Sequence, residues 1–441
     1  MNLSGMTEKA QGLLKHLLID NPEVEDRIEN GIERNRKGWG NIELVDSEDK
    51  PISAASISLK QIKHEFHFGC NAFLLDQLPE AEKNAQYREI FGDLFNLAVV
   101  PFYWSDLEPE EGKLRFEKDS PFRYRRPPPD LVLDFCKEKN ITPKGHPLLW
   151  HLFRPNWLPH DELGMRRHIH RRFQQIAERY ADKISIWDVC NEAQTMTVNQ
   201  PSAHMPENHV EYAFELAERY FPNNIRTYND DRIWYRYSRS YTPVYLLAKY
   251  LIDQGYKVDA LGFQYHMFEN TLPYADQNLN PVNLLNCFDL YERLKVPLNI
   301  SEISIISGHD LGDGDAFQEI VTEKLYRLWF SHAAMNGIVW WNLVDNTAAY
   351  APLGDETAGE NQCRAGLLNY DMTPKPAYKA LRRLIKEEWQ TNPTLEYTEG
   401  AANQFRGFYG DYEVTVKTAR GSSIHQISLS NKSLNQFKLK I

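Results

Sequence analysis

Two glutamates follow short apolar runs and are the residues of this chain best suited to act together in a reaction. Glu192 ends the segment 187–192, and Glu302 stands within the segment 299–303. A carboxyl group at the edge of an apolar core is costly unless it is paired or used. Two facing carboxyl groups can supply an acid together with a nucleophile or a base, as glycoside hydrolysis requires. For either glutamate alone, the alternative is a structural salt bridge.

Eight short apolar segments would position these glutamates. The predicted strands are residues 66–73, 97–103, 142–149, 184–190, 225–229, 260–266, 298–303 and 338–344. Between them, apolar residues such as Met165, Ile169 and Phe173 recur at helical spacing, which predicts helices with one apolar face. The pattern favours an α/β fold, a closed (β/α)8 TIM barrel with catalytic groups at the C-terminal ends of its strands. An open doubly wound sheet is the alternative, but no Gly-x-Gly-x-x-Gly follows the first strand.

The two ends of the chain predict smaller elements outside the barrel. Residues 13–34 are expected to form a helix, and residues 41–45 and 54–59 a β-hairpin. After a last helix at residues 376–388, strand-like pieces follow at 405–410, 412–418 and 424–429. Because an isolated hairpin is marginally stable in water, we expect it to join these strands in a small accessory β-element. The predicted domains are residues 1–65 (helix and hairpin), 66–390 (barrel) and 391–441 (C-terminal β-element).

Composition argues against several classes of partner. The formal net charge of −11 disfavours nucleic acid or an anionic membrane surface as the main partner, because both would be repelled. A neutral polysaccharide or oligosaccharide is compatible with this charge. The 10 Trp and 23 Tyr suit the recognition of sugar rings by stacking, although a large core also uses aromatic residues. We make no prediction of an oligomeric state.

Neither a cofactor nor a metal is expected. The five cysteines are widely spaced without a Cys-x-x-Cys pair, which indicates neither a zinc site nor a disulfide framework. His168 and His170 would point to different faces of a helix and could not chelate one ion. The first 30 residues contain no uninterrupted apolar stretch. We therefore expect a cytoplasmic protein, or a secreted one whose signal has been removed.

The segments around the two glutamates belong to an ordered series of motifs. They are residues 145–151 (GHPLLWH), 187–192 (WDVCNE), 228–230 (YND), 264–266 (QYH), 300–302 (ISE), 340–341 (WW) and the run 366–378 into the last helix. In this order they resemble family 10 of the glycoside hydrolases, the endo-β-1,4-xylanase family, over residues 66–387. The resemblance implies retaining, endo-acting hydrolysis of β-1,4-linked xylan by double displacement, with Glu192 as general acid/base and Glu302 as nucleophile.

The resemblance also implies roles for residues around the reacting sugar. The substrate-binding positions carried over are His146, Trp150, Asn191, Tyr228, Gln264, His266 and Trp341. Asn191 is expected to donate its amide to a sugar 2-hydroxyl, and His266 to donate to Glu302 and hold it as a carboxylate. Trp341 and Trp150 would form a floor and a wall for the sugar. The alternatives are a buried turn amide, a structural histidine and core packing, respectively.

Two segments depart from the pattern of this family. The family usually carries Glu-Asn-x-x-Lys after the second strand to grip sugars on the non-reducing side, and residues 101–109 lack the Asn and the Lys. A second tryptophan usually follows the eighth strand, whereas Tyr350 is the nearest aromatic residue here. Arg123, Arg125 and Arg126 could meet an acidic substituent such as a glucuronic acid branch, or could be solvated surface charge.

These departures leave two alternatives open. One keeps the mechanism but changes the substrate to another β-glycan or to short xylo-oligosaccharides. The other is a non-catalytic, carbohydrate-binding barrel. The presence of Glu192 and Glu302 together with Asn191 and His266 argues against the second alternative, because binding alone needs no acid and no nucleophile.

Overall fold

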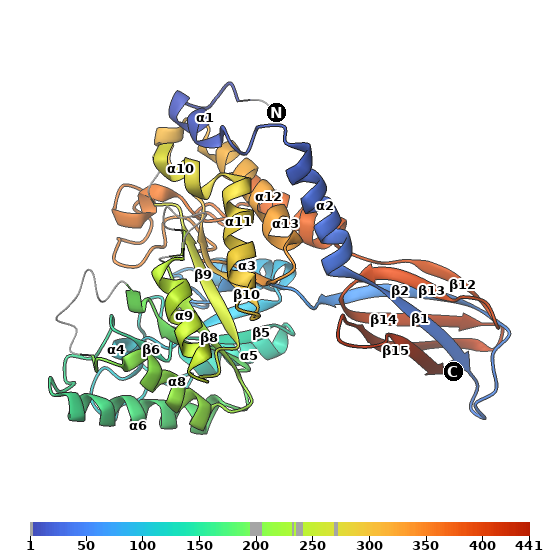
Figure 1. Cartoon of the computed structure of the whole chain (residues 1–441), viewed down its shortest axis with the longest axis horizontal. Coiled ribbons are helices and arrows are strands. Elements are labelled where there is room, and N and C mark those ends of the chain that lie inside the picture. The colour runs from blue at the N-terminus through green and yellow to red at the C-terminus, as the bar shows by residue number, and fades with distance from the viewer. Residues whose placement is uncertain (1–2, 195–204, 232, 235–240, 269–271) are drawn as a thin grey trace.

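The protein consists of two bodies that lie side by side (Figure 1). The computed structural model describes residues 3–194, 205–231, 233–234, 241–268 and 272–441. Helices surround a central sheet in the larger body, and the smaller body shows strands only. The helix α2 (Pro22–Arg36) leads from the larger body to the smaller one, where the C-terminus also lies. The chain therefore enters the smaller body near its beginning and returns to it at its end.

The larger body is a closed ring of eight parallel strands. In ring order they are β3 (His67–Asn71), β4 (Leu97–Pro101), β5 (Thr142–His146), β7 (Ile186–Asn191), β8 (Ile225–Asp230), β9 (Ala260–His266), β10 (Leu298–Ser304) and β11 (Met335–Trp340). β11 pairs with β3 and closes the ring, and the two-residue β6 (Leu149–Trp150) extends it beside the end of β7. β4 is covered on both faces, and all of its residues are accordingly apolar and buried. The predicted (β/α)8 TIM barrel is confirmed.

Helices cover the outside of this ring. The longer ones are α3 (Ala81–Leu94), α5 (Pro129–Glu138), α6 (Glu162–Tyr180), α8 (His209–Tyr220), α9 (Pro243–Asp253), α11 (Pro281–Glu292), α12 (Gly314–Ser331) and α13 (Pro376–Arg383), which a π-helical turn (Leu384–Glu388) extends. α6 shows why they form: Asp161 caps its first turn, and its apolar stripe, including Met165 and Phe173, is buried against the barrel. No helix within the described ranges is long and apolar enough to cross a membrane.

The N-terminal segment forms two helices rather than the single predicted one. α1 (Glu8–Leu14) ends well before α2, which begins with Pro22 and is capped by the Asn21 side chain. A proline at the first helical position starts a helix but cannot continue one, which explains the break. The apolar residues of both helices, such as Leu13 and Ile28, belong to the core of the barrel. These helices therefore pack on the larger body.

The smaller body is a sandwich of two sheets drawn from both ends of the chain. One sheet has the order β13 (Gln404–Phe408), β1 (Lys37–Val45), β16 (Gln436–Lys440). The other has the order β12 (Thr394–Thr398), β2 (Ala54–His64), β14 (Gly410–Thr418), β15 (Gly421–Leu429). Ile42 and Leu44 of β1 and Ile57 and Leu59 of β2 are buried in one shared core.

The predicted hairpin of the first two strands is wrong. β1 and β2 lie in different sheets, and the isolated bridge at this turn joins Val45, the last residue of β1, to Pro51, which precedes β2. β2 instead pairs along most of its length with β14, and β1 pairs with β13 and β16. Each of the two strands pairs with strands from the C-terminal part of the chain on both of its edges, whereas a hairpin would pair only one edge. Their apolar faces are still buried against each other. The segment after β1 thus crosses between the sheets.

Candidate active site

The C-terminal ends of the barrel strands surround a cavity of about 680 Å³. The predicted site residues that line it are His146, Trp150, Asn191, Glu192, Gln264, His266, Glu302 and Trp341. Loop residues complete the wall, among them Tyr103, Arg125, Arg126, Phe153 and Tyr350. One cavity therefore brings the two glutamates together with all but one of the predicted site residues.

Glu302 stands in β10 and is held by side chains from two neighbouring strands. Asn229 Nδ2, at the end of β8, donates to Glu302 Oε1 at 2.9 Å, and His266 Nε2, at the end of β9, lies 3.2 Å from Oε2. His146 Nε2 lies 3.9 Å from Oε1. The Glu302 side chain is almost fully buried. A buried carboxylate with several directed donors keeps a single orientation, as an attacking group needs.

Glu192 lies directly after β7 with a left-handed backbone, at φ 52°. Its N–H donates to the Asn229 carbonyl oxygen at 2.9 Å, and Gln264 Nε2 donates to its Oε1, also at 2.9 Å. Burial, and then the nearby charge of Glu302, raise the pKa of Glu192 from 4.5 to about 8, although the Gln264 hydrogen bond acts in the opposite direction. Glu192 therefore carries a proton at neutral pH and can donate it.

Asn191 combines a satisfied oxygen with an unsatisfied amide. Its Oδ1 accepts from Asn229 Nδ2 at 2.8 Å and from Gln264 Nε2 at 3.3 Å. Asn191 Nδ2 is buried and has no hydrogen-bond partner among the residues that the structure describes. Since buried donors are nearly always paired, this amide is available for a group in the cavity.

Two charged side chains inside the barrel, Asp188 and Lys144, fix the position of His146. Its Nδ1 lies 2.8 Å from Asp188 Oδ2, and Lys144 Nζ lies 2.9 Å from Asp188 Oδ1. Burial alone would raise the pKa of Asp188, but Lys144 and His146 outweigh it and hold that pKa below its ordinary value. The aspartate thus fixes the ring so that Nε2 faces Glu302. Asp188, Lys144 and Asn229 are functional residues without a role predicted from the sequence, and their polar side chains within apolar strands are the signal that could have revealed them.

Aromatic rings form the walls on one side of the cavity. Trp341 packs edge to face against His146 at 5.5 Å and Phe73 at 5.3 Å. Trp150 lies against Phe153 at 5.0 Å. Tyr350 stacks on Phe153 at 5.9 Å, with 83% of its surface exposed. Trp150, Phe153 and Tyr350 thus pack in succession, and the last ring is exposed. An exposed aromatic ring is suited to stacking against a sugar.

Tyr228 is the predicted site residue that does not line the cavity. The side chain is wholly buried, and its hydroxyl donates to Asp230 Oδ2. The register between β7 and β8 shifts between Asp188 and Cys190, so that Tyr228 pairs with Cys190. Asn229, the next residue, occupies the site instead.

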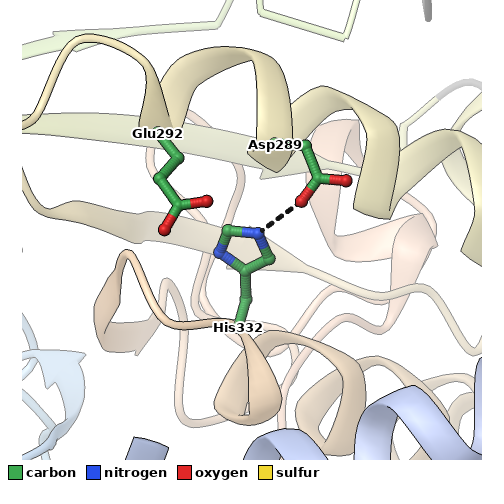
Figure 2. Close-up of side chains that lie close together, drawn as sticks. All are labelled: Asp289, Glu292 and His332. Atoms are coloured by element: carbon green, nitrogen blue, oxygen red, sulfur yellow. Dashed lines mark hydrogen bonds and ion pairs between the residues drawn. The ribbon is translucent and has the colours of Figure 1, made fainter.

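One cluster outside the cavity combines groups that metals bind. Asp289 and Glu292 of α11 lie close to His332, directly after α12, with possible ligand atoms within 4.8 Å of one another (Figure 2). Both carboxylate oxygens of Asp289 already accept from Arg27, and His332 Nε2 lies 3.1 Å from the same carboxylate. His332 Nδ1 accepts from the Ala334 N–H at 3.3 Å. Because a guanidinium repels a cation and both ring nitrogens are engaged, this cluster fits an ion-paired clamp that holds α2 to α11.

Comparisons with known proteins agree with this fold. A model of glycosyl hydrolase family 10 matches residues 60–384. The anti-sigma-I factor RsgI6 of Acetivibrio thermocellus is 26% identical over 411 residues, which is 92% of this chain and 48% of that protein. This chain thus spans about half the length of that relative. The endo-1,4-beta-xylanase B of Thermotoga neapolitana is 24% identical over 362 residues, covering 79% of this chain and 95% of that enzyme.

A solved structure supports the fold independently. The native xylanase 10B of Thermotoga maritima superimposes with a TM-score of 0.57 at 23% identity, covering 74% of this chain and 96% of that one. A closed barrel with two carboxyl groups, after the fourth and in the seventh strand of the ring, defines the class of barrel glycoside hydrolases. Within this class, the chain belongs to glycosyl hydrolase family 10.

Proposed function

We propose that this chain cleaves a β-1,4-linked, xylan-type polysaccharide at internal bonds with retention of configuration. One observation carries the proposal: Glu192 and Glu302 line the same cavity in opposite electrostatic surroundings. Glu192 has a pKa raised to about 8, and Glu302 is held by an amide and an imidazole. Two carboxyl groups whose environments differ in this way suit an acid and a nucleophile.

The first step forms a covalent intermediate. A Glu302 oxygen attacks the anomeric carbon while the bond from that carbon to the leaving oxygen breaks. The Glu192 proton moves to the leaving oxygen, so the aglycone departs as an alcohol and Glu192 becomes a carboxylate. In the second step, Glu192 takes a proton from water, the water oxygen attacks the same carbon, and Glu302 is released.

The neighbouring residues support this sequence of steps. The free Asn191 amide is placed to donate to the sugar 2-hydroxyl, a bond that strengthens as the ring becomes oxocarbenium-like. His146 and His266 orient the nucleophile, and Gln264 orients the acid. Trp341 provides an apolar surface beside the reacting ring. In this proposal each polar group contacts either the sugar or one of the two carboxyl groups.

The choice of xylan rests on relatives. Family 10 membership and the relative from Thermotoga neapolitana, which is named an endo-1,4-beta-xylanase, favour this substrate over other β-glycans. A cavity that only binds sugar would need neither a protonated Glu192 nor a fixed Glu302. Hydrolysis is therefore the better proposal than binding alone.

The test is hydrolysis of linear xylan, with the anomer of the first product read by proton NMR. The wild type should release the β-anomer first and cut internal bonds, and Glu302→Ala should lose turnover while remaining folded. Glu82→Ala, which removes an exposed glutamate in the first turn of α3, is the matched control and should retain full activity. Release of the α-anomer, or turnover by Glu302→Ala close to that of the wild type, would overturn the proposal.

A further inference from the structure

The side of the cavity opposite Glu192 is basic. β11 stands four places from β7 in the eight-stranded ring, so the loops after β11 and β3 face Glu192 across the barrel mouth. Arg125 enters this region from the loop before α5. Its Nη1 donates to the Thr347 carbonyl oxygen at 2.8 Å, and its Nη2 donates to Asn342 Oδ1, both partners lying after β11. Arg125 and Arg126 both line the catalytic cavity.

Arg125 is a buried cation whose partners are neutral. Its side chain is 4% exposed, and its Nε has no hydrogen-bond partner among the described residues. Within those residues, none of the cavity carboxylates (Glu192, Asp231, Glu302 and Glu360) makes an ion pair with it. Burial lowers the pKa of Arg125, which reflects the free-energy cost of holding this charge away from water. A buried charge of this kind is stabilised by a counter-ion.

A comparison with two other buried arginines, Arg36 and Arg172, shows how Arg125 differs from them. Arg36 and Arg172 also donate to backbone carbonyl groups, and in both of them Nε makes one of these bonds. Neither of them lines the catalytic cavity. Arg125 differs in both respects, since it borders the cavity and keeps a free donor. The hydrogen bonds by which Arg125 anchors its loop to Thr347 and Asn342 therefore leave its free Nε, and its position beside the cavity, unexplained.

The neighbouring arginines, Arg123 and Arg126, add positive charge to this side of the cavity. Arg126 Nε donates to Asp106 Oδ2 at 3.0 Å, and its guanidinium lies 3.8 Å from the centre of the Tyr103 ring. Arg123 donates to the other oxygen of Asp106 at 2.8 Å. Among the described residues, Arg123 and Arg126 share this one carboxylate, whereas Arg125 donates only to the neutral oxygens of Thr347 and Asn342. The alternative of solvated surface charge is wrong for Arg125 and Arg126, because both are buried.

We propose that the basic side of the cavity, opposite Glu192, binds the carboxylate of a uronic acid unit in the glycone part of the substrate. Arg125 is the main anchor, and Arg126 lies beside it. The inference rests on the proposed function, which sets the direction of the substrate. The leaving aglycone must depart on the side of its proton donor, Glu192. The glycone, attached to Glu302, therefore extends toward the opposite side, where the arginines lie. A planar guanidinium fits a carboxylate through paired hydrogen bonds.

The test compares a xylo-oligosaccharide that carries one glucuronic acid branch with the same compound after reduction of its carboxyl group to an alcohol. Wild-type kcat/KM should be about ten- to a hundredfold higher for the acid, as expected for hydrogen bonds between charged groups. The uronic acid should be found by mass spectrometry on the fragment that carries the new reducing end. A ratio near one, or a branch on the other fragment, overturns the proposal.

Variants separate charge recognition from loop tethering. Arg125→Gln should bring the ratio of acid to neutral substrate close to one, whatever its effect on the absolute rate. Arg123→Gln is the control, since Arg123 belongs to the same loop, is part-exposed and binds Asp106 without lining the cavity; the ratio should persist. An unchanged ratio in Arg125→Gln overturns the assignment.

A binding measurement keeps this inference separate from the proposed function. In calorimetry on the wild type, free glucuronate should bind at least about tenfold more tightly than glucose. A preference for glucuronate without hydrolysis of any xylan would support the anion site and reject the hydrolytic function. Equal affinity for glucuronate and glucose would reject the anion site, whether or not xylan is hydrolysed.

Discussion

The two sides of the cavity are positioned in different ways. On one side, Gln264 and Glu302 stand within β9 and β10, whose backbone pairing fixes the direction of each side chain. On the other side, Arg125, Phe153 and Tyr350 stand on loops with left-handed backbone, at φ 58°, 51° and 62°. A left-handed conformation costs roughly 1 kcal/mol or more for residues of these types, so it persists only where surrounding contacts enforce it.

This difference indicates that the strands and the loops of the cavity have different roles. Groups that must meet a reacting atom stand on or next to the barrel strands, where small displacements are resisted by the whole sheet. Groups that recognise the rest of the substrate stand on loops, which can change without disturbing the chemistry. Glu192 lies at the boundary, directly after β7 but with a left-handed backbone of its own. We therefore expect changes on the strand side to affect kcat and changes on the loop side to affect selectivity or KM.

The largest expected effect is the loss of the nucleophile. Glu302→Ala should lower kcat by about 10⁴-fold or more, because it removes the carboxylate that forms the covalent intermediate. Glu302→Gln should behave similarly, which separates loss of charge from loss of volume. Steady-state kinetics on linear xylan, with circular dichroism to show that the fold is kept, provide the measurement. If Glu302→Gln kept most of its kcat, the strand side would not carry the nucleophile.

The second expected effect depends on the leaving group. Glu192→Ala should lower kcat on xylan by about 10²- to 10⁴-fold, the usual contribution of general acid–base catalysis. On an aryl xylobioside whose leaving group is 2,4-dinitrophenolate, the first step needs no proton, so its rate should approach that of the wild type. A burst of dinitrophenolate followed by slow turnover is the signature. Equal losses on both substrates would contradict the acid role of Glu192.

The third prediction concerns pH. Because the acid form of Glu192 is required and its pKa is raised to about 8, activity should be lost as pH rises through about 8. A folded-state pKa above the ordinary 4.5 also means that the contribution of this group to stability is greatest below pH 4.5 and declines as pH rises toward 8. Glu192→Gln should remove this part of the pH dependence of the free energy of unfolding.

A companion variant identifies the cause of this pKa. Glu302→Gln removes the negative charge that contributes to the shift, so the pKa of Glu192 should fall in that variant while staying above 4.5, because burial is the larger cause. Carbon NMR of labelled glutamate, recorded across the pH range, would give the value directly. A pKa of Glu192 that stayed the same in Glu302→Gln would show that the two carboxyl groups are not coupled.

Much of the strand side could be predicted from the sequence because its signals are local. Apolar runs of strand length, ending in polar residues at regular intervals, indicate a parallel barrel with its site at one rim. The structure places Glu192, Glu302 and Asn191 at that rim. Tyr228 was assigned to the site only through the resemblance of its motif. Side chains alternate along β8, so Tyr228 and Asn229 point to opposite faces, and it is Asn229 that contacts Glu302.

The loop side and the sandwich were less predictable because their contacts join distant parts of the chain. Arg125 is separated from Thr347 by 222 residues, so its burial could not be inferred from its neighbours in sequence. The pairing of β2 with β14 is likewise a long-range choice that outweighs the local hairpin. Division of the chain into separate folding units at residues 65 and 390 stays a prediction, and it must accommodate α1 and α2, which pack on the barrel.

The smallest expected effect lies at the outer end of the loop side. Tyr350 is largely exposed and stacks on Phe153, so Tyr350→Ala should remove a sugar-stacking surface and raise KM about three- to tenfold, with little change in kcat. Tyr350→Phe should keep the ring and the affinity. Tyr241→Ala, which removes an exposed tyrosine that does not line the cavity, is the control. Because stacking acts equally on the bound substrate and the transition state, a fall in kcat at constant KM would mean that Tyr350 acts on the reacting ring, and the division between the two sides of the cavity would fail at this residue.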